Sequence, residues 1–201
     1  GFGATPPAIG TGRAMDSIIQ ALSGLMMTSG SPGDPPVRVG VPMADLLTPV
    51  FGVVGVLSAL RQREKTGAGQ HVDVSMLGVL TSFVAAEPFD LLEACGLTQR
   101  TGRMVPRLTP FGIYQSADGY VAICAPTEQF ARGVFAAIGH PEFEVDARYA
   151  TREARVAHVD ALNAEIEAYT RLHPTAALLA ILERHGVPAA EVRSPADGVR
   201  D

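Results

Sequence analysis

The chain has 201 residues, of which 47% are hydrophobic, and a formal net charge of -5. This length and apolar content are enough to bury a core, which excludes a disordered chain and indicates one large or two small domains. The acidic balance, with no stretch of Lys and Arg interleaved with aromatic residues, argues against a phosphate-backbone binder, so we expect no nucleic-acid partner.

The cysteine and hydropathy patterns restrict the cellular setting. Neither Cys95 nor Cys124 has a Cys or His at metal-ligand spacing, so we expect no disulfide framework, no metal site and a cytoplasmic chain with buried thiols. The sequence opens without a secretory leader pattern, and its most apolar window, 46–60, is shorter than a bilayer span. We therefore expect a soluble protein with no membrane partner. Neither end carries a capping pattern, which favours a piece of a longer protein.

The N-terminal part of the sequence predicts a helix, a loop and a second helix. Residues 17–27 have helical apolar spacing, and Asp16 is placed as the N-cap. The Gly-, Ser- and Pro-rich segment 28–41 predicts an ordered loop. A helix is expected over 48–65, because Pro49 suits a first helical position and a glycine follows the end. Its apolar residues cover nearly every face, so we expect it to be buried in a larger body.

A strand pattern and another apolar helix come next. Val72, Val74 and Met76 fall on one side of segment 70–76, which predicts a strand. A helix is expected over 77–94. Helix, strand and helix in this order indicate part of an α/β layer.

The rest of the sequence predicts a linker and a smaller unit. Segment 96–110 is rich in Gly, Arg, Thr and Pro and predicts a linker. Strands over 113–116 and 120–125, joined by an Asp-Gly turn, predict a hairpin. The remaining expected elements are helices over 127–138, 151–169 and 175–185 and a short strand over 190–192. Two α/β units follow, one over 1–95 and a smaller α/β (α+β) domain over 111–193.

Asp45 is the acidic residue between two largely apolar stretches, directly before the second predicted helix. The helix dipole and the free N–H groups of the first turn stabilise an anion there, and apolar neighbours limit its hydration. A partly desolvated carboxylate is a competent nucleophile toward an activated acyl group. Aspartate is also a preferred helix cap, so the residues alone leave a capping role open.

Other residues that often carry chemistry have simpler interpretations here. The five histidines have no Ser or Cys partner at suggestive positions, which argues against a histidine-based triad. The Thr-Gly-Ala-Gly-Gln phrase at 66–70 follows a helix and precedes a strand, whereas a phosphate loop needs the reverse order. We interpret it as a turn.

Segment 18–76 contains several specific motifs in order: Gln-Ala-Leu-Ser-Gly, Gly-Asp-Pro-Pro, an Asp before an apolar helix, Arg-Glu-Lys-Thr-Gly-Ala-Gly-Gln and Ser-Met. Together they resemble the signature region of the family III CoA-transferases, also called the CaiB/BaiF family, and weaker similarity continues to about residue 192. The resemblance implies that Asp45 is the catalytic nucleophile. It also implies acyl-CoA and carboxylic acid substrates and no permanently bound cofactor.

The resemblance further implies the fold, the assembly and the CoA contacts. Segment 1–95 would be part of a Rossmann-like large domain, 194–201 would begin a linker back to it, and two chains would form an interlocked homodimer. The implied CoA contacts are Arg13, Ala14, Met15, Asp16 and Met76. From the residues themselves, Arg13 is equally well a solvated loop charge and Met76 a core methionine.

The implied reaction passes through Asp45, first as a mixed anhydride with the donor acyl group and then as a thioester with CoA. Racemases of the same fold family instead use an opposing His and a supporting Glu around the α-carbon of an acyl-CoA. Those positions fall on Met15 and near Thr127, one place from Glu128. A methionine cannot exchange protons, so CoA transfer is favoured over racemisation. A non-catalytic piece that only assembles with a partner is the remaining alternative.

Overall fold

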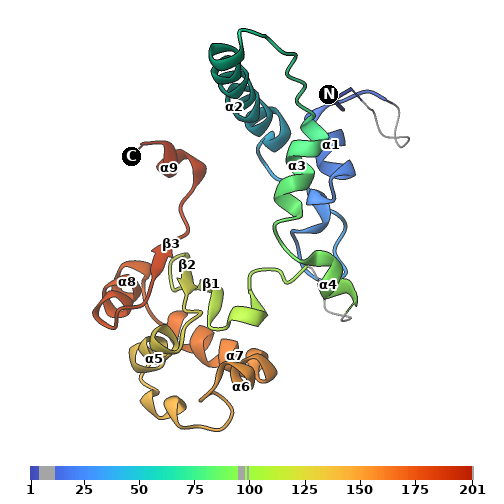
Figure 1. The fold of residues 1–201 in the computed structure, drawn as a ribbon. Helices are drawn as coiled ribbons and strands as arrows, with labels where there is room; N and C mark the ends of the chain where they lie inside the picture. The colour runs from blue at the N-terminus through green and yellow to red at the C-terminus, as the bar shows by residue number, and fades with distance from the viewer. Residues whose placement is uncertain (5–11, 95–97, 99, 201) are drawn as a thin grey trace. The chain divides into compact units, whose positions relative to one another are not determined.

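The structure is a computed structural model that describes residues 1–4, 12–94, 98 and 100–200. It divides into two units, Gly1–Gly102 and Arg103–Asp201 (Figure 1). Cys95 lies outside the described residues. Helices accompany a small antiparallel sheet, in agreement with the predicted α/β class.

The first unit is helical over its described residues. Its elements are α1 (Asp16–Leu22), the 3-10 turn η1 (Leu25–Met27), α2 (Met43–Thr66), α3 (Met76–Val84) and α4 (Phe89–Ala94). Its small core contains Ile19 of α1, Ala44 of α2 and Leu80 of α3, all of which are almost completely buried. The three helices therefore meet at the N-terminal end of α2.

The first helix is shorter than the sequence predicts. The expected helix over 17–27 is divided into α1 and η1 at Gly24, whose φ of 84° is left-handed. Glycine adopts this conformation at little cost, and it ends the regular helix. The predicted N-cap is also wrong, because Met15 occupies the cap position and Asp16 is the first helical residue.

The second helix begins earlier than its proline signal predicts. It starts at Met43 and includes Pro49 within its length. Because proline has no N–H, the Asp45 carbonyl lacks the helical donor that residue 49 would otherwise provide. The helix nevertheless starts upstream, because the Ala44 N–H donates to the Asp16 carboxylate at 2.8 Å.

Most of α2 is exposed in this chain, although the sequence predicts a buried helix. Of its 24 residues only Ala44 is fully buried. Its exposed large apolar residues are Leu46, Val50, Phe51, Val53, Val54, Val56, Leu57 and Leu60. Among the described residues, α2 alone is long and apolar enough to cross a membrane, a test that core helices of soluble proteins also pass. The apolar helix is thus longer than the window 46–60 from which the sequence prediction was made.

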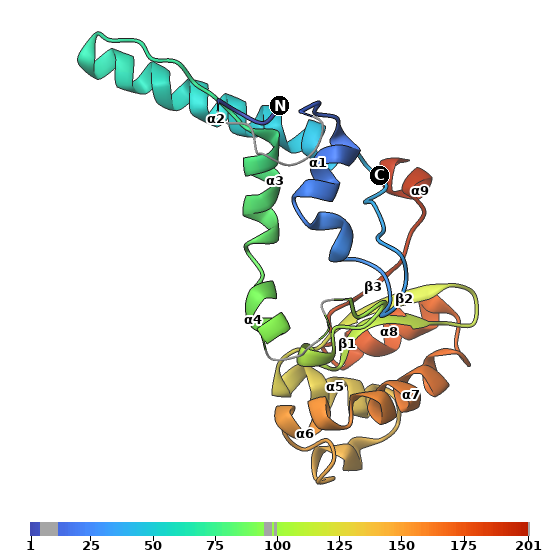
Figure 2. The ribbon, with the colours of Figure 1, turned by 90° about the vertical axis from the view of Figure 1, so that its right-hand side faces the viewer.

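The predicted strand over 70–76 is not formed. Segment 70–75 is extended and runs back along α2 (Figure 2), where the Val72 side chain lies against Gly55. The predicted alternation survives, since Val72 and Val74 are partly buried and Asp73 is exposed. A strand requires a hydrogen-bonded neighbour, and none pairs with this segment within the described part of the unit.

The helix expected over 77–94 is interrupted. The structure has two shorter helices there, α3 and α4, and Pro88 directly precedes α4. Proline removes a helical donor and its ring clashes with the preceding turn, which accounts for the break. Ser75 begins α3 by accepting a hydrogen bond from the Gly78 N–H at 3.1 Å and donates to the Phe2 carbonyl at 2.9 Å.

Arg100 organises the Gly- and Pro-rich loop that leads to α2. Its buried guanidinium donates to the carbonyls of Ser29, at 2.8 Å, Pro35, at 2.8 Å, and Asp34. Gly30 lies directly against this guanidinium, because a Cβ on Gly30 would overlap Nη2 of Arg100. The hydrogen bonds from Arg100 to these carbonyls therefore order the loop. Arg100 itself lies in segment 96–110, which the sequence predicts as a linker.

The second unit contains the sheet. The strands β1 (Phe111–Gln115), β2 (Tyr120–Cys124) and β3 (Ala189–Glu191) are antiparallel in the order β1-β2-β3. The predicted hairpin and last strand are thus confirmed, with the last strand one residue earlier. Asp118 of the turn accepts hydrogen bonds at 2.8 Å from the Thr175 N–H and hydroxyl, which ties the hairpin to the start of α8 (Thr175–Arg184), more than 50 residues later in the sequence.

Three helices share one core with this sheet: α5 (Glu128–Ala137), α7 (Val159–Thr170) and α8 (Thr175–Arg184). The remaining helices of the unit are α6 (Arg152–Ala157) and α9 (Pro195–Arg200), which buries none of its residues, and the short 3-10 turns are η2 (Pro106–Leu108) and η3 (Pro141–Glu144). Fully buried Ile123, Leu162 and Leu178 join β2, α7 and α8, and each such side chain stabilises by about 1.5–3 kcal/mol. The helix predicted over 151–169 is broken at His158, whose φ of -117° and ψ of 28° are not helical.

We predict that the 201-residue chain alone self-associates, because the exposed apolar surface of α2 is larger than a soluble monomer tolerates. Replacing Val53 by Glu and Leu57 by Lys adds an i,i+4 ion pair on α2 and should reduce association, measured by light scattering against concentration. Val145→Lys, at an exposed valine of the other unit, serves as the control and should have no such effect. A monodisperse, cooperatively melting wild-type monomer would contradict this prediction.

We predict that Gly30→Ala destabilises the chain more than Gly33→Ala does. Both glycines have left-handed φ values, 97° and 84°, so each substitution costs about 1 kcal/mol of backbone strain. Only the new Cβ at position 30 meets Arg100, and displacing that buried guanidinium breaks its carbonyl contacts for about 1–3 kcal/mol more. Urea unfolding followed by circular dichroism measures the difference, and equal losses for the two variants would show that the Arg100 contact is unimportant.

Candidate functional site

Asp45 lies in the first turn of α2, with an exposed side chain. The cap position belongs to Pro42, so Asp45 is not the helix cap that the sequence leaves open. Among the residues that the structure describes, no side chain hydrogen-bonds to its carboxylate. The helix dipole favours an anion in the first turn. The carboxylate is therefore accessible and available for reaction, although it is less enclosed by apolar walls than predicted.

Three of the five residues implied as CoA contacts lie at this end of α2. Ala14 and Met76 pack against the core that contains Ala44, the neighbour of Asp45. Asp16 reaches the same place through its hydrogen bond to the Ala44 N–H. These side chains thus support the start of α2, and Met76 has the core role that the sequence leaves open.

The other two implied contacts are at the surface. Arg13 is exposed, and Met15 has 69% of its surface exposed, one residue before α1. Both are accessible to a ligand, so a role in CoA contact stays a prediction for them.

The sequence predictions miss two residues that organise this end of the unit. Gln20 is completely buried, on α1, and Arg100 is nearly so. Both form hydrogen bonds with backbone groups of the segment that precedes Asp45. The i,i+4 spacing of Asp16 and Gln20 on a predicted helix is a sequence signal for their contact, although only folding shows that Gln20 is buried. Arg100 has no comparable signal, because its partners are carbonyls more than 60 residues away in the sequence.

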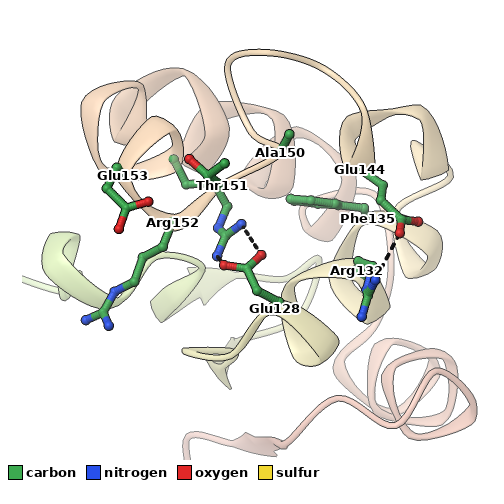
Figure 3. Close-up of a pocket in the computed structure, with 9 residues that line it drawn as sticks. Glu128, Arg132, Phe135, Glu144, Ala150, Thr151, Arg152 and Glu153 are labelled. Carbon is green, nitrogen blue, oxygen red and sulfur yellow. Dashed lines mark hydrogen bonds and ion pairs between the residues drawn. The ribbon is translucent and has the colours of Figure 1, made fainter.

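A separate pocket of about 550 Å³ occurs in the second unit, mainly between α5 and the start of α6 (Figure 3). Its lining residues are Glu128, Arg132, Phe135, Glu144, Ala150, Thr151, Arg152, Glu153 and Arg155. Arg132 pairs with Glu144 at 3.1 Å, and Arg155 forms two hydrogen bonds with Glu128 at 2.9 and 3.0 Å. These two arginines therefore face carboxylates of the protein itself.

Arg155 is the buried member of its ion pair with Glu128. Its side chain is 1% exposed, whereas that of Glu128 is 54% exposed. It also donates to the carbonyls of Thr109, at 3.2 Å, and Tyr149, at 3.1 Å. The hydrogen bonds from Arg155 hold the pKa of Glu128 below its ordinary value. Glu128 is thus committed to a structural pair, which argues against its assignment as the supporting Glu of a racemase.

We predict that Glu128→Gln destabilises the chain at pH 7 by about 1 kcal/mol, a value reduced from that of a buried pair because Glu128 is half exposed. A carboxylate with a lowered pKa stabilises the folded state above its ordinary value of 4.5, and this contribution is lost as the pH falls. Wild type and variant should therefore converge as the pH falls through the lowered pKa of Glu128, which urea unfolding between pH 7 and about pH 3 measures.

The control for this prediction is Glu153→Gln, the same chemical change in the first turn of α6. It should alter the free energy of unfolding by less than about 0.5 kcal/mol at pH 7. A Glu128→Gln effect that persists unchanged at pH 3 would contradict the ion-pair explanation.

The chain resembles several known CoA-transferases in sequence. It is 35% identical to acetyl-CoA:oxalate CoA-transferase of Acetobacter aceti over 198 residues, which cover 98% of the chain and 51% of that protein. It is 33% identical to succinyl-CoA–D-citramalate CoA-transferase of Chloroflexus aurantiacus, covering 100% of the chain and 50% of the relative. The chain therefore spans about half the length of these curated relatives.

Solved structures share the fold. A CaiB/BaiF family protein from Brucella suis matches with a TM-score of 0.81 and 34% identity, covering 100% of the chain and 53% of that protein. Rv3272 from Mycobacterium tuberculosis matches in fold, with a TM-score of 0.82 at 22% identity, over 100% of the chain and 52% of that protein. The sequence pattern of CoA-transferase family III matches residues 1–201. The chain belongs to CoA-transferase family III.

Proposed function

We propose that this chain carries the nucleophile of a CoA-transferase, and that the nucleophile is Asp45. The accessible carboxylate in the first turn of α2 is the observation that carries the proposal. The family match over residues 1–201 and the CoA-transferase names of the relatives support the reaction class. Both named relatives use at least one dicarboxylic acid, which favours a dicarboxylic acid among the substrates.

In the proposed reaction, an Asp45 oxygen attacks the thioester carbonyl of the donor acyl-CoA. The C–S bond breaks, CoA leaves as a thiolate, and a mixed anhydride remains on Asp45. The thiolate then attacks the aspartyl carbonyl, which releases the donor acid and leaves a thioester between Asp45 and CoA. The acceptor carboxylate reverses these two steps and restores free Asp45. Each step exchanges one activated acyl bond for another, so the exchange needs no external source of energy.

The structure gives Asp45 two features that suit this role. Its carboxylate is exposed, so it can meet the thioester carbonyl. Its position near the N-terminus of a 24-residue helix stabilises negative charge on the free carboxylate between turnovers. CoA and acyl-CoA are substrates in this proposal, and we propose no permanently bound cofactor.

Racemisation has less support than transfer. The position that needs a proton-exchanging His carries Met15, an exposed thioether. The nearest carboxylate to the expected supporting Glu is Glu128, which pairs with Arg155. The interlocked homodimer and the cytoplasmic location also stay proposals, supported by the family resemblance and by the cysteine pattern, respectively.

We predict that Asp45 becomes covalently modified when acyl-CoA is supplied to the full-length gene product without an acceptor acid. Hydroxylamine should convert this one side chain to a hydroxamate, which mass spectrometry detects in the peptide 41–61. Asp45→Ala and Asp45→Asn should abolish both modification and transfer, because neither side chain is a nucleophilic anion. Asp45→Glu keeps the charge but moves the carboxylate by about 1 Å, and transfer should fall by about a hundredfold.

Asp73, an exposed aspartate of the same unit, provides a matched control, since Asp73→Asn should leave the labelling of Asp45 intact. Transfer that continues with label elsewhere, or with no label, would remove Asp45 from the mechanism. Exchange of the α-proton of a 2-methylacyl-CoA with solvent, catalysed by the wild-type protein, would favour racemisation instead.

A further inference from the structure

Gln20 is completely buried, and both the oxygen and the nitrogen of its side-chain amide form hydrogen bonds. Its oxygen accepts from the Val39 N–H at 2.9 Å, and its nitrogen donates to Asp16 Oδ2 at 2.8 Å and to the Val41 carbonyl at 3.3 Å. Val39 and Val41 belong to the loop that leads into α2. The amide therefore fixes this loop to α1 only a few residues before Asp45.

Asp16 continues the same network. While Oδ2 accepts from Gln20, Oδ1 accepts from the Ala44 N–H at 2.8 Å, across 28 residues of sequence. Ala44 is completely buried and is the residue before Asp45. An unpaired N–H in the first turn of a helix needs an acceptor, and Asp16 supplies it. Two adjacent side chains of α1 thus hold residues 39, 41 and 44.

We propose that Asp16 and Gln20 form a positioning pair that sets the backbone of Asp45 for attack on the thioester; this inference rests on the proposed nucleophilic role of Asp45. The pair acts through the backbone, since neither side chain bonds to the Asp45 carboxylate. A displacement of about 1 Å between reacting groups can lower a rate by about a hundredfold, so this support affects the chemical step.

The hydrogen-bond polarity of the pair provides a specific test. Asp16→Asn places an NH₂ group against either Gln20 Nε2 or the Ala44 N–H, so one contact loses its acceptor. Gln20→Glu places a second carboxylate against Asp16. The double variant restores complementary partners, because the new amide at position 16 would donate to the new carboxylate at position 20 and accept from the Ala44 N–H. That carboxylate would also accept from the Val39 N–H, whereas the 3.3 Å contact with the Val41 carbonyl loses its donor and leaves two acceptor oxygens facing each other.

The experiment measures the single-turnover rate of Asp45 acylation and the KM for acyl-CoA in the full-length gene product. All variants are measured under conditions where circular dichroism shows them folded. Each single variant should lower the acylation rate by at least about tenfold with KM within about twofold of wild type, and the double variant should return to within about threefold of the wild-type rate. Glu64→Gln, at an exposed ion pair near the end of α2, should behave as wild type.

The outcomes separate this inference from the proposed function. A double variant as slow as the slower single variant overturns the positioning pair. A raised KM in Asp16→Asn alone, with an unchanged acylation rate, also overturns it, because it shows that Asp16 contacts CoA directly. Wild-type rates in both single variants, with Asp45 still labelled, overturn the pair and leave the nucleophile intact. A wild-type protein that is never labelled at Asp45 overturns both.

Discussion

The hydrogen bond from the Ala44 N–H to the Asp16 carboxylate connects α1 to the start of α2, directly before the proposed nucleophile. It provides an acceptor for a first-turn N–H of α2, which a helix otherwise leaves unpaired. The same contact joins α1 to α2 beside the core formed by Ile19, Ala44 and Leu80. Asp45 is the next residue along the chain, so its position depends on that contact.

Two further groups support the loop before α2, and both act on backbone atoms. Gln20 bonds to Val39 and Val41, and Arg100 bonds to carbonyls between Ser29 and Pro35. A loop rich in Gly and Pro forms few hydrogen bonds of its own, since proline has no N–H and glycine adds no side chain. Buried polar side chains from outside the loop supply the missing partners. The side chain of the proposed nucleophile is thus accessible to solvent, while hydrogen bonds fix the backbone that precedes it.

The second unit depends on a different charged group. Arg155 is buried and donates hydrogen bonds to the Glu128 carboxylate and to the carbonyls of Thr109 and Tyr149. A buried guanidinium is costly unless its donors are paired, and here backbone and carboxylate acceptors surround it. This commitment removes Glu128 from the set of free carboxylates of the second unit.

The sequence by itself determined the features that depend on local contacts. Alternating residues and an Asp-Gly turn identified the hairpin of β1 and β2, and helical spacing identified α5 and α8. The ordered motifs around Asp45 identified the family. Tertiary structure decided where α2 begins, because the acceptor for Ala44 comes from Asp16, far away in the sequence. It also decided that 70–75 forms no strand, because a strand requires a partner and periodicity describes only one chain segment. Gln20 and Arg100 were missed for the same physical reason: a buried polar side chain takes its role from the groups that folding places around it.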